Sequence, residues 1–154
     1  MNVAGRTVLI TGATGGLGHA IARRLAVAGA HVVLSGRRAE VLSELAGEIG
    51  GEVAPADLSD PDAVRALAQA HAGIDILVAN AGVPASGRLQ TYSDDQIERA
   101  LLVNLHAPII LSQLLRDLLD GGTFGHAVGA KCEKGREASE RDQQARASDG
   151  EDAD

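Results

Sequence analysis

Short apolar runs alternate along most of the chain with stretches in which apolar residues recur at helical spacing. The runs consist mainly of Val, Ile and Leu, which is typical of strands buried on both faces of a parallel sheet. Strands are predicted at 8–10, 31–35, 52–56 and 74–79. Helices are predicted over 18–28, 40–49, about 61–73 and from about 94 towards 119. Ser59 or Asp60 is expected to cap the third helix, and Pro108 is expected to kink the last.

The regular alternation of strands and helices predicts right-handed crossovers, and therefore an α/β fold with a doubly wound parallel sheet. In such a sheet, ligands bind beyond the carboxyl ends of the strands, near the switch in strand order. Residues suited to ligand contact lie at or just past the predicted strand ends: Gly12, Gly36, Asp57 and Asn80. Because these positions converge on one edge of the sheet, we expect a binding site there.

A glycine-rich turn joins the first predicted strand to the first predicted helix. Residues 11–18 read Thr-Gly-Ala-Thr-Gly-Gly-Leu-Gly. Glycine lets main-chain N–H groups approach a phosphate closely, and the positive end of the helix dipole points to the same place. The turn therefore indicates a cradle for nucleotide phosphates, although glycine-rich turns also serve simply as connections.

Composition and charge narrow the possible classes of protein. A length of 154 residues suits one domain, and an aromatic content of 1% means that Ala, Val, Leu and Ile must build its core. A net charge of −7 argues against nucleic acid or an anionic membrane as partner. The single Cys132 favours a reducing cytoplasm, and no stretch is long and apolar enough to span a membrane. The five histidines show no metal-ligand spacing, so no metal is expected.

The chain changes character after Phe124. Residues 125–154 contain no Leu, Ile, Phe, Tyr or Trp, and they carry five basic and eight acidic residues. Such a segment has little apolar surface with which to offset the entropy of ordering. We therefore expect a nucleotide-binding domain over residues 1–124, followed by a disordered or loosely helical tail over 125–154.

Taken together, these motifs resemble those of the short-chain dehydrogenase/reductase family over about residues 5–122. The Asn-Ala-Gly triplet at 80–82 resembles the signature that follows the fourth strand in the compact branch of that family. The turn matches the glycine spacing of the compact branch through Gly12, Gly16 and Gly18, and that of the extended branch through Gly12, Gly15 and Gly18. The triplet favours the compact branch, and the resemblance implies a Rossmann-like fold that binds NAD or NADP.

The resemblance also implies roles for residues at the other strand ends. Gly36 stands where NAD-preferring relatives have Asp, and Arg37 follows it, which favours the 2′-phosphate of NADP over NAD. Alternatively, Arg37 and Arg38 are simply solvated turn residues. Asp57 would accept a hydrogen bond from the adenine amino group. The implied cofactor contacts are Thr11, Gly12, Gly16, Leu17, Gly18, Arg37, Asp57, Leu58, Asn80, Ala81 and Gly82.

The catalytic residues of the family are largely missing from this sequence. Asn104 lies in an apolar helical stretch, where we expect a buried, hydrogen-bonded amide, and in the family the matching Asn supports a proton relay. The family's proton donor is a Tyr with a Lys four residues later, beside a Ser. Tyr92 is followed at that spacing by Gln96, and neither Lys131 nor Lys134 has such a tyrosine upstream.

These observations predict an NADP(H)-binding protein from an oxidoreductase family that acts on carbonyl or alcohol groups. We expect the chain to be truncated after about the fourth strand and its helix, through a frameshifted or truncated reading frame near residue 122, and to be inactive alone or a frameshifted remnant. Two alternatives are a non-catalytic regulatory module that binds NADPH and an interaction protein that uses the acidic tail. Helix 94–119 is expected to mediate self-association through exposed leucines, namely Leu101, Leu105, Leu111, Leu114, Leu115 and Leu118.

Overall fold

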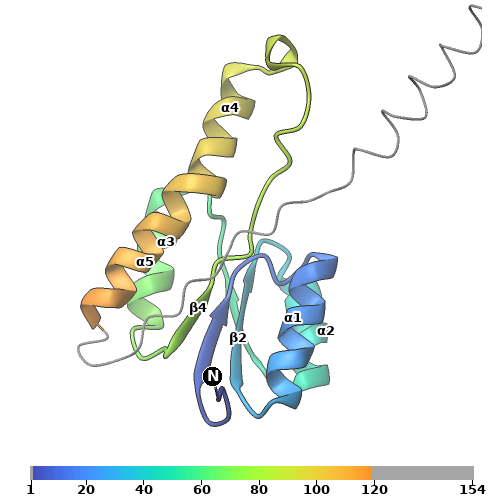
Figure 1. Cartoon of the computed structure of the whole chain (residues 1–154), viewed down its shortest axis with the longest axis vertical. Coiled ribbons are helices and arrows are strands. Elements are labelled where there is room, and N and C mark those ends of the chain that lie inside the picture. Colours follow the sequence, from blue (N-terminus) through green and yellow to red (C-terminus); the bar gives the residue numbers. More distant parts are fainter. Residues whose placement is uncertain (1, 119–154) are drawn as a thin grey trace, which may run out of the picture.

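A computed structural model describes residues 2–118, in which strands and helices alternate as an α/β fold (Figure 1). The strands are β1 (Thr7–Ile10), β2 (His31–Gly36), β3 (Glu52–Pro55) and β4 (Ile76–Val78). The helices are α1 (Gly16–Val27), α2 (Ala39–Ile49), α3 (Pro61–Ala70), α4 (Asp94–Leu101) and α5 (Ala107–Leu118). A short 3₁₀ turn, η1 (Leu89–Thr91), precedes α4, and a π-helical turn, η2 (Leu102–His106), joins α4 to α5.

The four strands form one parallel sheet in the order β3-β2-β1-β4. Leu9 of β1 lies between Val33 of β2 and Leu77 of β4 in this register. The chain moves outward from β1 to β3 and then returns to the other side of β1 with β4. The strand order therefore switches beside β1, as in Rossmann-like sheets.

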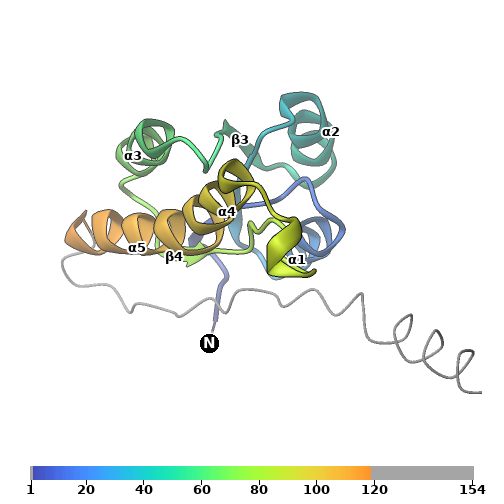
Figure 2. The same cartoon turned by 90° about the horizontal axis from the view of Figure 1, so that it is seen from above.

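Helices cover both faces of the sheet: α1 and α2 lie on one side, and α3 and α5 lie on the other (Figure 2). Successive strand residues face opposite sides, so each strand supplies both cores. Leu9 and Val33 pack into the core beneath α3 and α5, whereas Ile10 and Leu34 pack into the core beneath α1 and α2. Burial on both faces explains why the strands appear in the sequence as short, continuous apolar runs.

The predicted doubly wound sheet and its four strands are confirmed, and β4 is shorter than the predicted range. The helix caps follow the local sequence. Asp60, rather than Ser59, caps α3 by accepting a hydrogen bond from the Asp62 N–H at 2.9 Å, and Pro61 begins the helix. Gly50 ends α2 in the left-handed conformation, with φ of 69°.

The expected single helix from residue 94 is interrupted, and the distortion begins before Pro108 rather than at it. Residues 102–106 form the π-helical turn between α4 and α5. Pro108 has no N–H to donate to the carbonyl of Asn104, four residues earlier, and a wider turn accommodates that loss. The predicted tail at 125–154 and the expected helix end near 119 lie outside the described residues. Within residues 2–118, no helix is long and apolar enough to cross a membrane.

Candidate nucleotide-binding site

The glycine-rich turn leaves the carboxyl end of β1 in a tight backbone path. Thr11 is buried, and its N–H donates to the Val78 carbonyl at 3.0 Å. Gly12 follows with φ of +67°, a conformation that side chains disfavour. A Cβ at Gly12 would lie 2.7 Å from Cα of Ala81. Glycine is therefore required here both by the backbone conformation and by the closeness of the segment after β4.

The glycines that begin α1 differ in their surroundings. A Cβ at Gly18, which is buried, would overlap the Gly12 carbonyl oxygen and lie 2.9 Å from Cα of Ala13. Gly16 is exposed, and a Cβ there would meet nothing within 4 Å. The internal packing of the chain thus requires Gly12 and Gly18, whereas the space beside Gly16 is open.

The amino end of α1 has no side-chain cap. Its N-cap residue is Gly15, and no acidic residue lies in the first turn. The first N–H groups of an α-helix have no partners within the helix, and the helix dipole places partial positive charge there. A twelve-residue helix that begins behind an open glycine turn can therefore bind an anionic group with its main chain.

Asn80 connects the ends of β1 and β4 where the strand order switches. Its Nδ2 donates to the carbonyl oxygens of Thr11 at 3.1 Å and Gly12 at 3.2 Å. In return, the Thr11 Oγ1 accepts from the Ala81 N–H at 3.1 Å. Asn80 thus ties the end of β1 to the segment after β4, and Ala81 and the exposed Gly82 lie directly after it.

The end of β2 lies against the glycine-rich turn. A Cβ at Gly36 would lie 3.1 Å from Cγ2 of Thr14, so this approach leaves little room for a side chain. The Nη2 of Arg38 donates to the Thr14 carbonyl at 2.6 Å and ties the two segments together. Arg37 is exposed and makes no hydrogen bond or ion pair with another residue of the described chain. Arg38 is thus engaged with the turn, whereas the guanidinium of Arg37 remains available.

Asp57 follows β3 at the same edge of the sheet. Its Oδ1 accepts from the Ser59 N–H at 3.0 Å and from the Ser59 hydroxyl at 2.7 Å. The backbone N–H of Ser59, then its hydroxyl, and then the charges of Arg99 and Arg37 hold the pKa of this carboxyl below its usual range. Asp57 is therefore an anion at neutral pH. The side chain of Leu58 is buried in the core beneath α3 and α5, so only its backbone faces this edge.

Asn104 is bonded as predicted, but the expectation that it is buried is wrong. Its Oδ1 accepts from the Val83 N–H at 2.8 Å, and its Nδ2 donates to the Val83 carbonyl at 2.9 Å. The residue is nevertheless exposed, because the π-helical turn and the segment after β4 meet at the surface. Both polar atoms of the amide are occupied in fastening these two segments together.

Three contacts at this edge were missed by sequence reasoning: the Arg38–Thr14 hydrogen bond, the Ser59–Asp57 hydrogen bonds and the approach of Arg99 to Asp57. Ser59, two residues after Asp57, offered a local signal, since Asp side chains often bond the backbone two residues on. The other two join residues far apart in the sequence, and no local pattern marks them. No cluster of three or more metal-ligating side chains occurs in residues 2–118.

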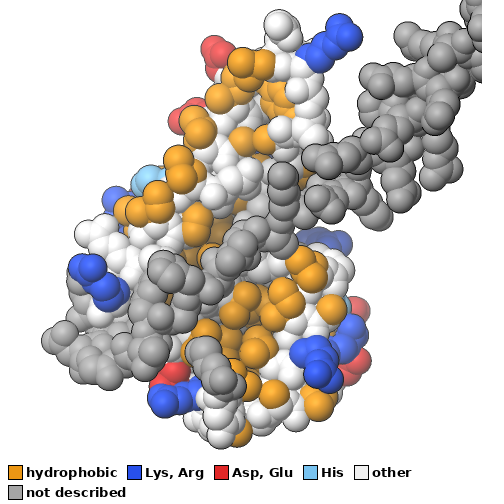
Figure 3. Space-filling model, viewed as in Figure 1, with side chains coloured by type: hydrophobic (Ala, Val, Ile, Leu, Met, Phe, Trp, Pro, Cys, Tyr) orange, Lys and Arg blue, Asp and Glu red, His pale blue; other side chains and the backbone are white. Residues whose placement is uncertain are grey.

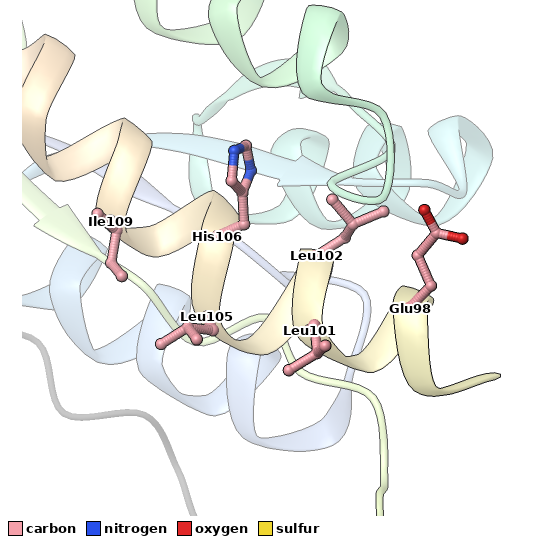
Figure 4. A pocket seen from close by; sticks show the side chains of 6 residues that line it. All are labelled: Glu98, Leu101, Leu102, Leu105, His106 and Ile109. Atoms are coloured by element: carbon pink, nitrogen blue, oxygen red, sulfur yellow. The ribbon is translucent and has the colours of Figure 1, made fainter. Parts of the chain in front are cut away.

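An apolar face runs along α4, the π-helical turn and α5 (Figure 3). Leu101, Leu105 and Ile109 are each more than half exposed. A groove on this face is lined by Glu98, Leu101, Leu102, Leu105, His106 and Ile109 (Figure 4). The expected exposure is wrong for Leu111 and Leu115, which are buried in the core that α5 shares with α3, and Leu114 is half-buried against the same core. The side chain of Leu118 lies outside the described part of the chain.

Comparison with known proteins agrees with the fold and the glycine turn. The family model described as short chain dehydrogenase matches residues 6–143, which extends past residue 122, where the motif resemblance was expected to end. The chain therefore belongs to the short-chain dehydrogenase/reductase family, whose members are NAD(P)-dependent oxidoreductases.

Individual relatives cover the same region. Nodulation protein G of Rhizobium sp. (strain N33) is 48% identical over 117 residues, which is 72% of this chain and 48% of the relative. A metagenomic short-chain oxidoreductase solved with NADP has a TM-score of 0.74 and 35% identity, covering 88% of this chain and 67% of that one. BdcA solved with NADPH has a TM-score of 0.71 and 34% identity, and the match covers 76% of this chain and 48% of that one. The chain spans about half the length of the curated relatives it matches.

Proposed function

We propose that this chain binds NADP(H) at the carboxyl edge of its sheet. The observation that carries the proposal is the uncapped start of α1 behind an open glycine turn, where the pyrophosphate would meet main-chain N–H groups. Gly12 and Gly18 bring the backbone close, and the open position at Gly16 leaves room for the ligand. Thr11 and Leu17 complete this turn, Thr11 by supporting Ala81 and Leu17 as an exposed apolar side chain beside the phosphates.

The end of β2 favours NADP over NAD. No carboxylate stands at Gly36 to bind the ribose hydroxyls and repel a 2′-phosphate, and the free guanidinium of Arg37 can form paired hydrogen bonds with that phosphate. Asp57 and the backbone of Leu58 would contact adenine, while Asn80, Ala81 and Gly82 would form the wall at the β1–β4 switch. The structures of two relatives that hold NADP or NADPH support this choice of cofactor.

We further propose that this chain alone binds the nucleotide without hydride transfer. NADPH would supply the hydride, but family chemistry also needs a proton donor, and this sequence has no Tyr with a Lys four residues later. The side chain of Asn104, the residue that would support the family's proton relay, bonds the backbone of Val83 and does not replace the missing tyrosine.

Isothermal titration calorimetry of the purified chain with NADPH and with NADH tests the proposal by measuring the Kd for each nucleotide. We expect saturable binding of NADPH and weaker binding of NADH. The substitution Arg37→Met should reduce the preference for NADPH by about tenfold or more, since a hydrogen bond to a charged group contributes about 1.5–3 kcal/mol. Arg65→Met is the matched control, because Arg65 lies on the exposed face of α3 and pairs with Asp62. Absence of saturable NADPH binding would refute the proposal, and steady oxidation of NADPH with a carbonyl substrate would refute its non-catalytic part.

The apolar face of α4 and α5 supports a second proposal, that two copies of this chain associate through it. Leu101, Leu105 and Ile109 recur every four residues and expose a continuous apolar stripe. Exposed stripes of this kind are uncommon on monomeric proteins. A second copy presents the same stripe, so a twofold contact would cover both.

A further inference from the structure

Arg99 of α4 approaches the candidate adenine contact. Its Nη2 lies 3.9 Å from Oδ2 of Asp57, and the two side chains are 43% and 45% exposed. Arg99 and Asp57 are forty-two positions apart in the chain and belong to different segments of the carboxyl edge. The ion pair thus brings a cation from α4 to a carboxylate that we expect to face the nucleotide.

The two oxygens of Asp57 have different surroundings. Oδ1 accepts both hydrogen bonds from Ser59, at 3.0 and 2.7 Å. Oδ2 accepts no hydrogen bond from any residue of the described chain and faces Arg99. A carboxylate oxygen can accept two hydrogen bonds, so Oδ2 can receive an N–H from a ligand while it remains beside the guanidinium.

The ion pair is also what links the side chains of α4 to the sheet edge. Ser93 and Gln96 bond each other in the capping box at the start of α4. Within residues 2–118, Arg99 makes the one hydrogen bond or ion pair that joins a side chain of α4 to a residue outside the helix and its cap. Because α4 extends beyond the carboxyl ends of the strands (Figure 1), Arg99 links this projecting helix to Asp57, the residue that we expect to contact adenine.

We propose that Arg99 is a positioning residue of the nucleotide site, which holds Oδ2 of Asp57 toward the exocyclic amino group of adenine. The inference rests on the proposed binding of NADP(H). Ser59 fixes one oxygen of the carboxylate and Arg99 attracts the other, so the group is oriented before the ligand arrives. Orientation in advance lowers the cost of ordering on binding. Arg99 would therefore contribute to the preference for adenine over other bases through its effect on Asp57, without contacting the base itself.

The test compares NADPH with its hypoxanthine analogue, in which a carbonyl oxygen replaces the exocyclic amino group. The wild-type chain should bind NADPH more tightly than the analogue. Arg99→Met should raise the Kd for NADPH by about two- to fivefold, the range expected of an exposed ion pair, and should bring the two Kd values closer together. Arg65→Met removes another half-exposed arginine that pairs with an aspartate, and it should leave both Kd values unchanged.

A double substitution tests whether Arg99 affects the Kd for NADPH through Asp57. In an Asp57→Ala background, Arg99→Met should cause no further change in the Kd for NADPH, because the carboxylate that Arg99 positions is gone. Equal weakening of both ligands by Arg99→Met, or an undiminished effect in the Asp57→Ala background, would overturn the inference while leaving the proposed function in place. Failure of the wild-type chain to bind NADPH would overturn the proposed function itself, and the inference with it.

Discussion

At the scale of single residues, the glycines of the turn are needed for two different reasons, internal packing and space for a ligand, which the sequence pattern alone does not distinguish. Gly12 and Gly18 are fixed by contacts within the chain, because an added Cβ would meet backbone atoms. Gly16 has no such neighbour, so its lack of a side chain is explained by the ligand that we propose. Substitutions at these positions should therefore divide into effects on folding and effects on binding.

Gly18→Ala should lower the free energy of unfolding by about 1–3 kcal/mol, because its Cβ would overlap the Gly12 carbonyl oxygen and force the turn to shift. Gly16→Ala should leave the free energy of unfolding close to wild type and raise the Kd for NADPH. Gly47→Ala is the control, since Gly47 lies exposed in α2 with open space around it and alanine should stabilise the helix by about 0.5–1 kcal/mol. Urea unfolding and NADPH titration of the three variants measure both effects. A stable Gly18→Ala variant would contradict this division.

The residues at the strand ends were predictable to different degrees. Gly12, Asn80 and Asp57 stand beside buried strands, so the sequence places them at one edge once the sheet is assumed. The orientation of Arg38 and Arg99 was not predictable, because each contacts a residue that is distant in the sequence and neither contact belongs to a repeating pattern. Asn104 shows the same limit: its hydrogen bonding followed from its chemistry, whereas its exposure depends on how the π-helical turn meets residue 83.

At the scale of elements, β1 and β2 were predicted well because both of their faces are buried, which confines them to mainly apolar residues. The last helix was predicted less well, because Pro108 marks a break in the helix but does not show that a π-helical turn occupies the five residues from 102 to 106. Strand pairing depends in addition on polar contacts at the amino edge of the sheet. There Asp75, just before β4, accepts from the Thr7 N–H and from the Arg6 guanidinium, both at 2.8 Å.

The contacts of Asp75 predict how acid should affect the pairing of β4 with β1. The Thr7 N–H first, and then Arg6, hold the pKa of Asp75 below its usual range. A carboxyl with a lowered pKa stabilises the fold above its unfolded-state value, and that contribution is lost as pH falls through the lowered folded-state value. The free energy of unfolding should therefore fall with acid more steeply in the wild type than in Asp75→Ala. Chemical unfolding between neutral and acid pH measures both slopes, with Asp62→Ala, at an exposed α3 position, as control. Equal slopes in wild type and Asp75→Ala would exclude this role.

At the scale of the whole molecule, residues 2–118 form a buried core and leave one apolar face of α4 and α5 exposed. Leu111 and Leu115 of α5 lie in the core with α3, so the helix is anchored to the sheet by the chain itself. The opposite side of the same helix and of α4 exposes Leu101, Leu105 and Ile109. The glycine turn before α1 and this apolar face are built from different elements, so separate substitutions can alter the proposed binding and the proposed association.

Self-association through the apolar face predicts a mass that depends on protein concentration. The double substitution Leu101→Glu and Leu105→Glu should shift the chain toward the monomer, because each carboxylate would have to lose its hydration in the contact between copies. Val27→Glu is the matched control, since Val27 is 81% exposed on α1, away from this face. Sedimentation equilibrium over a range of concentrations distinguishes the three proteins. A monomeric wild-type chain, or an equal effect of Val27→Glu, would exclude this face as the interface, whereas retained NADPH affinity in the double variant would show that association is not needed to form the nucleotide site.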